Sequence, residues 1–157
     1  DLGDGQLARH LAQMACQLDY RGTICDPRED YQSAAQRDNV QYTREMPDDA
    51  VRRLADQART AVVTLAHDPR QDDLGLSAAL ESKAFYIGAL GSRRSAVARC
   101  WRLRSLGYGA RQSARIRGPA GLPIGSKRPA EIAVSILAEI TATRNGIVNN
   151  AQSEAGS

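Results

Sequence analysis

Short apolar segments alternate with longer amphipathic segments along this chain. Residues 60–66 are almost entirely apolar and β-branched, as expected for a parallel strand covered on both faces. Residues 22–25 and 84–87 are shorter runs of the same kind. Helical spacing of apolar residues predicts helices over 7–18, 48–59 and 71–82, and two more that begin after Ser92 and at Pro129. Strands that alternate with helices predict an α/β fold, a Rossmann-like three-layer sandwich around a mostly parallel sheet.

The same spacing predicts which side chains the last two helices bury. In the helix after Ser92, the apolar residues are expected to face the core and the arginines to face solvent. The apolar set is Ala96, Val97, Cys100, Trp101 and Leu103, and the arginines are Arg99, Arg102 and Arg104. In the helix from Pro129, Glu139 is interpreted as an ordinary surface acid.

The 157 residues suffice for one domain with a genuine core, which we assign to residues 1–146, followed by a flexible polar tail at 147–157. No run approaches the ~20 apolar residues of a membrane span, so no membrane partner is expected. Cys16, Cys25 and Cys100 are odd in number and far apart. This argues against a disulfide framework or a metal site and predicts a reducing, cytoplasmic location.

The net charge of +3 hides a strong asymmetry, because residues 83–128 carry 11 basic side chains and no acid. Such a block predicts an anionic ligand or partner. Nucleic acid is disfavoured because the block has few aromatic residues for stacking and the chain lacks a familiar nucleic-acid motif. A small phosphorylated ligand fits the charge better.

A dinucleotide-binding pattern opens the chain. Gly3, Gly5 and Ala8 match G-x-G-x-x-G/A, and Asp26 lies 21 residues beyond Gly5, where an acid reaches a ribose hydroxyl. Asp26 is alternatively a turn residue before Pro27. Only two residues precede Gly3, so we expect the first strand of the sheet to be truncated.

Residues 84–94 are the stretch around which the chemistry is organised. They predict a buried strand, a turn at Gly88 and Gly91, and a helix capped by Ser92. Arg93 and Arg94 then stand beside the positive end of the helix dipole, where a bound phosphate would supply a counter-charge. The alternative is that both arginines point into water.

Two further segments supply binding candidates. His67 and Asp68 follow a strand, at the edge where open α/β sheets bind ligands. His67 would hydrogen-bond a ligand or act as an acid or base; alternatively it is a turn residue and Asp68 caps the next helix. Residues 118–126 form a glycine–proline loop, in which Gly121 and Gly125 are weaker candidates.

Four runs in order resemble the XdhC/CoxI family, namely residues 60–69 (TAVVTLAHDP), 84–94 (AFYIGALGSRR), 118–126 (GPAGLPIGS) and 129–139 (PAEIAVSILAE). These are accessory proteins of xanthine dehydrogenase and related molybdenum hydroxylases, and the match is to their carboxy-terminal Rossmann-like domain. The resemblance implies a chaperone rather than a catalyst. It would bind molybdopterin, the molybdenum cofactor, in its simple or dinucleotide form, support its sulfuration and deliver it to the apo-hydroxylase.

The resemblance also implies partners and positions. A cysteine desulfurase would supply sulfur, and a homodimer is compatible with the family. The binding positions carried over are Gly3, Gly5, Asp26, His67, Asp68, Gly88, Gly91, Ser92, Arg93 and Arg94, then Gly121 and Gly125. No catalytic residue and no metal ligand is carried over.

The chain departs from the family pattern at several points. The family's amino-terminal domain with its cysteine motif is not in the sequence, Arg117 replaces a His, Ala66 replaces a Thr, and Arg128 replaces a capping Thr. Two other hypotheses remain: an NAD(P)-dependent oxidoreductase, and a fragment whose role is docking to another subunit.

Overall fold

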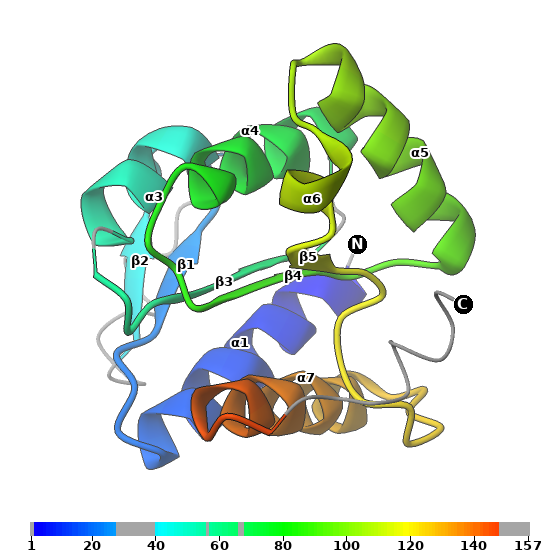
Figure 1. Ribbon diagram of the computed structural model, residues 1–157. Helices are drawn as coiled ribbons and strands as arrows, with labels where there is room; N and C mark the ends of the chain where they lie inside the picture. The colour runs from blue at the N-terminus through cyan, green and yellow to red at the C-terminus, as the bar shows by residue number, and fades with distance from the viewer. Residues whose placement is uncertain (1, 28–39, 56, 66–67, 148–157) are drawn as a thin grey trace.

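The computed structural model describes residues 2–27, 40–55, 57–65 and 68–147 (Figure 1). Helices and parallel strands alternate, which confirms the α/β fold. The helices are α1 (Leu2–Gln17), α3 (Pro47–Leu54), α4 (Pro69–Leu80), α5 (Arg93–Ser105), α6 (Ala110–Ser113) and α7 (Pro129–Arg144). The strands are β1 (Thr23–Cys25), β2 (Gln41–Thr43), β3 (Ala61–Thr64), β4 (Tyr86–Ala89) and β5 (Ile116–Arg117).

The strands form two parallel sheets. β1 pairs with β2, with Ile24 opposite Tyr42, and the second sheet has the order β3-β4-β5, with Val62 opposite Ile87. A doubly wound sheet carries one more strand immediately before its first helix. No described residue forms that strand.

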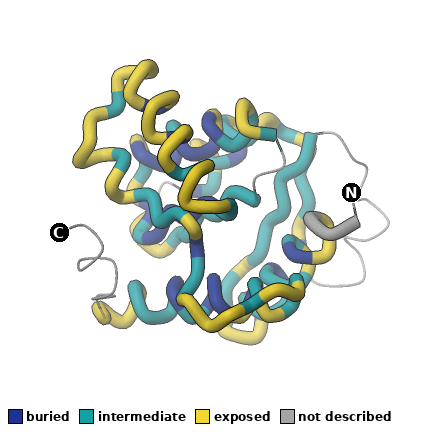
Figure 2. Tube along the Cα trace, turned by 90° about the vertical axis from the view of Figure 1, so that its right-hand side faces the viewer, coloured by how far each residue is buried: buried dark blue, intermediate teal, exposed yellow. Residues whose placement is uncertain are grey.

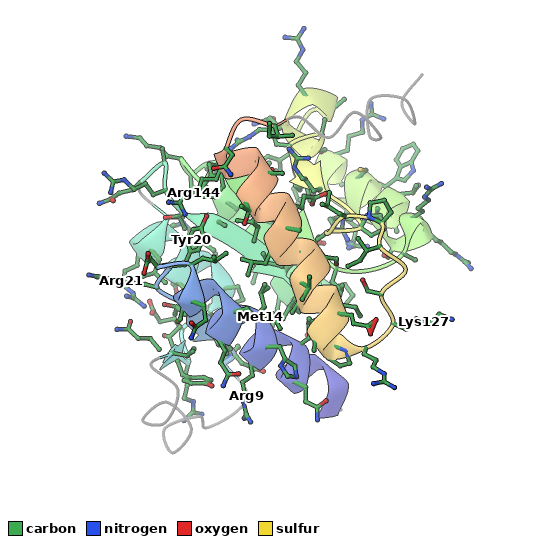
Figure 3. All side chains as sticks on the ribbon, turned by 90° about the horizontal axis from the view of Figure 1, so that it is seen from below. Arg9, Met14, Tyr20, Arg21, Lys127 and Arg144 are labelled. Carbon is green, nitrogen blue, oxygen red and sulfur yellow. The ribbon has the colours of Figure 1, made fainter. Side chains whose placement is uncertain are left out.

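Helices cover both faces of the β3-β4-β5 sheet and make three layers (Figure 1). α1 and α7 lie side by side below it, and the Arg144 guanidinium stacks on the Tyr20 ring at 5.1 Å where their ends meet (Figure 3). α3, α4 and α5 lie above. β4 is therefore buried on both faces: Ile87 packs with Leu76 and Leu103, whereas Tyr86 packs with Ile136 and Ile140. None of the described helices is long and apolar enough to cross a membrane.

Gly88 lies inside β4 and not in the turn that the sequence predicted. A Cβ at Gly88 would come within 2.7 Å of the Tyr86 ring, which leans along the strand over it. Glycine is needed here because the ring of Tyr86 occupies the space of a side chain. The prediction of Gly88 as a turn residue is wrong for this reason.

A buried carboxylate joins β4 to α7 and to the loop between β5 and α7. Glu139 is 1 % exposed, and its Oε1 accepts hydrogen bonds from the Tyr86 hydroxyl at 2.7 Å and the Gly121 N–H at 3.1 Å. Its Oε2 is buried with no hydrogen-bond partner in the described ranges. Burial, followed by the bond to Glu139, raises the pKa of Tyr86, so its hydroxyl keeps the proton that it donates. The interpretation of Glu139 as a surface acid is wrong, since its helical position faces β4.

We predict that Tyr86→Phe lowers the free energy of unfolding by about 1–3 kcal/mol, the typical cost of leaving a buried acceptor short of a donor. Urea denaturation measures it. The matched control is Tyr108→Phe, which removes a hydroxyl that donates to Glu81 at 2.9 Å on the surface. Its expected change is below about 0.5 kcal/mol. Equal losses in both variants would contradict the role of Glu139 as a buried anchor.

Candidate functional site

The carboxyl ends of β3 and β4 meet the amino-terminal ends of α1, α5 and α7 at one edge of the molecule, at the right in Figure 1 and facing the viewer in Figure 2. Hydrogen bonds hold the loops together there: the Leu90 N–H donates to the Thr64 carbonyl at 2.8 Å, and the Ala120 N–H donates to the Ala89 carbonyl at 2.9 Å. We call residues 68, 90–94 and 118–126 the carboxyl edge. The structure brings most of the predicted binding positions to it.

The turn after β4 has the predicted form. Gly91 has φ +142°, and a Cβ there would collide with the Ser95 hydroxyl. Ser92 caps α5, because its hydroxyl accepts from the Ser95 N–H at 3.1 Å while the Ser95 hydroxyl accepts from the Ser92 N–H at 2.9 Å. This reciprocal cap fixes the backbone of the turn and leaves the next N–H groups pointing outward.

Arg93 and Arg94 occupy the first turn of α5, and both are exposed. That turn contains no acid, and neither arginine pairs with a carboxylate among the described residues. Two guanidinium groups therefore stand beside the positive end of the helix without a counter-charge from these residues. An exposed arginine can bind a phosphate or remain hydrated, so their role in binding stays a prediction.

The loop between β5 and α7 packs its first half and exposes its second. Gly121 has φ +106°, and a Cβ there would lie 2.5 Å from the Ser135 hydroxyl on α7. Gly125 has φ +75°, is exposed and faces open space. Gly121 is thus explained by packing, and Gly125 by its backbone conformation alone.

Asp68 caps α4, since its Oδ1 accepts from the Arg70 N–H at 3.0 Å, as one of the two interpretations expected. His67 lies outside the described residues. Asp26 follows β1, and its own N–H donates to the Thr43 carbonyl at 3.1 Å. This places Asp26 at a carboxyl strand end, as the sequence predicted.

The predicted glycine turn at the start of the chain is absent from the described residues. Gly3 and Gly5 lie within α1, and a Cβ at Gly5 would meet open space. A tight glycine turn forms where a strand passes into a helix. In the described residues, α1 begins at Leu2 and includes both glycines.

The sequence predicted that Arg99 faces solvent. The structure instead buries it, with 7 % of its surface exposed. A Cβ at Gly118 would lie 2.7 Å from its Nη1, and a Cβ at Gly91 would lie 3.9 Å from its Nη2. The guanidinium therefore lies between the two glycine loops of the carboxyl edge. Burial, then the neighbouring Arg102, lowers the pKa of Arg99.

The cause is which stripe of α5 faces the sheet. Arg99 and Leu103 lie four residues apart on the inner face, whereas Val97 and Trp101, also four apart, are 59 % and 64 % exposed. Cys100 is exposed as well. Both stripes have helical spacing. The prediction that Val97, Cys100 and Trp101 are buried was wrong, because it selected the inner stripe from its apolar content alone.

The carboxyl edge is equipped to hold an anion. It offers guanidinium groups, a glycine turn and a helix amino terminus. No group of three or more His, Cys, Asp or Glu side chains in the described ranges could hold a metal ion. A hollow of about 270 Å³ lies elsewhere, at the amino end of β4, lined by residues 84–87, Ala114, Arg115 and Arg117. The Gly91 turn and the Ser92 cap follow the opposite, carboxyl end of β4, and we assign the site to the carboxyl edge on its chemistry.

Several proteins are similar to this chain. It is 39 % identical over 85 residues to the molybdenum cofactor insertion chaperone PaoD of Escherichia coli K12, covering 54 % of this chain and 27 % of that protein. It is 37 % identical over 75 residues to the uncharacterized protein YqeB of the same organism, covering 48 % of this chain and 14 % of that one. The chain thus spans about a quarter or less of the curated relatives it matches.

A solved structure shares the fold. The crystal structure of a xanthine dehydrogenase (BH1974) from Bacillus halodurans superposes with a TM-score of 0.70 at 23 % identity, covering 94 % of this chain and 42 % of that one. The family model described as the XdhC Rossmann domain matches residues 2–140. The chain belongs to the XdhC Rossmann domain family.

Proposed function

We propose that this chain binds the molybdenum cofactor at its carboxyl edge and helps to insert it into a molybdenum hydroxylase of the xanthine dehydrogenase type. Family membership and the similarity to a cofactor insertion chaperone support the proposal. The observation that carries it is the pair of exposed arginines at a capped helix start that has no acid. A chaperone must release its cargo, and exposed cationic groups in water bind phosphate reversibly.

The residues present fit the chemistry of the cofactor, which is an anionic pterin phosphate or its dinucleotide. Arg93 and Arg94 would hold phosphate oxygens, and the Gly91 turn allows the ligand to approach the backbone closely. The cofactor supplies the redox-active metal that the receiving hydroxylase needs. This chain would bind, orient and shield the cofactor. We propose that the protein acts in the cytoplasm.

Arg93→Ala combined with Arg94→Ala should reduce cofactor retention by about tenfold or more, because two charge-assisted contacts are lost. Pterin released from the denatured protein is measured by mass spectrometry and fluorescence. The control is Arg104→Ala combined with Arg111→Ala, which removes two exposed arginines outside the carboxyl edge. Equal retention by both double variants, or no pterin bound by the wild type at micromolar concentration, would refute the proposal.

Sulfuration of the cofactor is the finer part of the proposal, with a cysteine desulfurase as the sulfur donor. The Cys25 thiol does not suit sulfur transfer. Cys25 is half-buried, its Sγ donates to the Glu45 carbonyl at 3.2 Å, and burial followed by the charges of Glu45 and Asp26 raises its pKa to about 11. A thiol acts as a nucleophile only as the thiolate, so Cys25 is inert near neutral pH.

At pH 8, iodoacetamide should modify exposed Cys100 before Cys25, with Cys25 slower by about tenfold or more because little of it is thiolate. The Cys25 rate should rise with pH until about pH 11. Peptide mass spectrometry over time measures both, and the rates should become similar in urea. If Cys25 reacts as fast as Cys100 in the folded protein, the thiol is activated and a sulfur-carrying role returns.

An NAD(P)-dependent oxidoreductase is the second candidate, and Asp26 at the end of β1 is the observation that favours it. The placement of Gly3 and Gly5 inside α1 removes the turn that would receive the pyrophosphate. Titration of NADH fluorescence separates the two proposals. Saturable binding of NADH at micromolar concentration, with no pterin retained, would favour the oxidoreductase.

A further inference from the structure

Arg99 is the one buried arginine that the described part of the chain leaves without a hydrogen bond or ion pair. Arg102, on the same helix, differs from Arg99 because its guanidinium is paired. Arg102 grips Asp73 with two bonds, from Nε at 2.6 Å and from Nη2 at 3.2 Å. Asp72 and Asp73 act on Arg99 only electrostatically, and Asp73 is already committed. A guanidinium that is largely buried and has no partner loses much of its hydration without compensation, so its presence calls for an explanation.

The helix geometry explains how Arg99 reaches the carboxyl edge. Side chains of an α-helix lean toward its amino terminus, so a long side chain in the second turn of α5 extends back toward the first. The guanidinium accordingly approaches Gly91, the residue before the Ser92 cap. It therefore adds a buried positive charge to the helix end that already carries exposed Arg93 and Arg94.

The two glycines beside the guanidinium keep side chains away from it. A Cβ at Gly118 would lie 2.7 Å from the Arg99 Nη1, a distance shorter than Cβ atoms in proteins show. It would also lie 3.4 Å from the Ala96 Cβ. At Gly91, a Cβ would be 3.9 Å from Nη2. At Gly118 the guanidinium occupies the space that a side chain would fill, and Gly91 puts no side chain between its turn and the guanidinium, so a ligand at that turn can approach the cation.

We propose that Arg99 is the inner anchor of a phosphate-binding site, in which its guanidinium donates to the oxygens of a phosphate group bound at the Gly91 turn, at the start of α5. The ligand class is a phosphate monoester or diphosphate. This proposal deepens the proposed function. It rests on that function only for the identity of the molecule that bears the phosphate. Arg93 and Arg94 meet the ligand in water, whereas Arg99 holds it from a largely buried position, where the interaction is stronger.

Calorimetric titration with inorganic phosphate and with diphosphate tests the site without the cofactor. Arg99→Met should weaken binding of either anion by about tenfold or more, since it removes the charge at similar volume. The matched control is Arg104→Met, an exposed arginine on the same helix, which should bind as the wild type does. Equal affinity of Arg99→Met and wild type, or no binding by wild type at millimolar anion, would overturn the proposal.

A second variant displaces the guanidinium without removing its charge. Gly118→Ala puts a methyl group against Nη1, and a flexible side chain can yield to it with the fold retained. Anion affinity should fall while circular dichroism stays unchanged. An unchanged affinity would show that the position of the guanidinium does not matter, against the proposal.

Stability separates a binding role from a structural one. If Arg99 serves to bind a ligand, Arg99→Met removes an unpaired buried charge. The anion-free variant should then melt at a higher temperature than the wild type and bind less anion. A purely structural arginine predicts the opposite, a lower melting temperature, and that result would overturn the proposal.

The Arg99 anchor and the proposed function can be refuted independently. Pterin retained equally by Arg99→Met and wild type would refute the anchor and leave the proposed function standing. Anion binding that depends on Arg99, in a protein that retains no pterin, would support the anchor and refute the proposed function.

Discussion

The hydrogen bonds to the buried Glu139 carboxylate set the geometry on which the carboxyl edge depends. This side chain joins the central strand to α7 through Tyr86, and it joins α7 to the glycine–proline loop through the Gly121 N–H. The ring of Tyr86 in turn requires Gly88 beneath it. The bond from Tyr86 is buried and the bond from Gly121 is partly buried, so both are shielded from water and hold the loop that carries Gly118 close to β4.

The charges of the edge form two layers around that frame. Arg93 and Arg94 lie in solvent at the start of α5, and Arg99 lies largely buried between two glycine loops. An outer layer of this kind attracts anions over a distance, which salt weakens, while an inner cation acts at short range and is screened less. The acid-free sequence of residues 83–128 provides both layers at once.

The sequence alone predicted the α/β fold, the strand at 61–64, most of the helix positions and the Ser92 cap, because each has a strong local signal in apolar spacing or capping chemistry. It missed β2 and β5, which are short and polar and exist through pairing with distant strands. It misplaced Glu139, Arg99 and Gly88. The surroundings of Glu139 and Arg99 come from other segments, and a buried polar side chain carries no apolar signal of its own. Gly88 is set by the conformation of the Tyr86 ring, which the local sequence does not reveal. One available signal was overlooked: Arg99 shares its stripe with Leu103.

The most direct test of the central claim is a residue-resolved amide NMR titration of the ¹⁵N-labelled chain with the purified cofactor. We expect the largest saturable shifts on Gly91 to Arg94 and on residues 118, 120–122, 124 and 125, with little change in the exposed face of α5. Shifts centred on residues 84–87 and 114–117, around the hollow at the amino end of β4, or no shift at all, would contradict it.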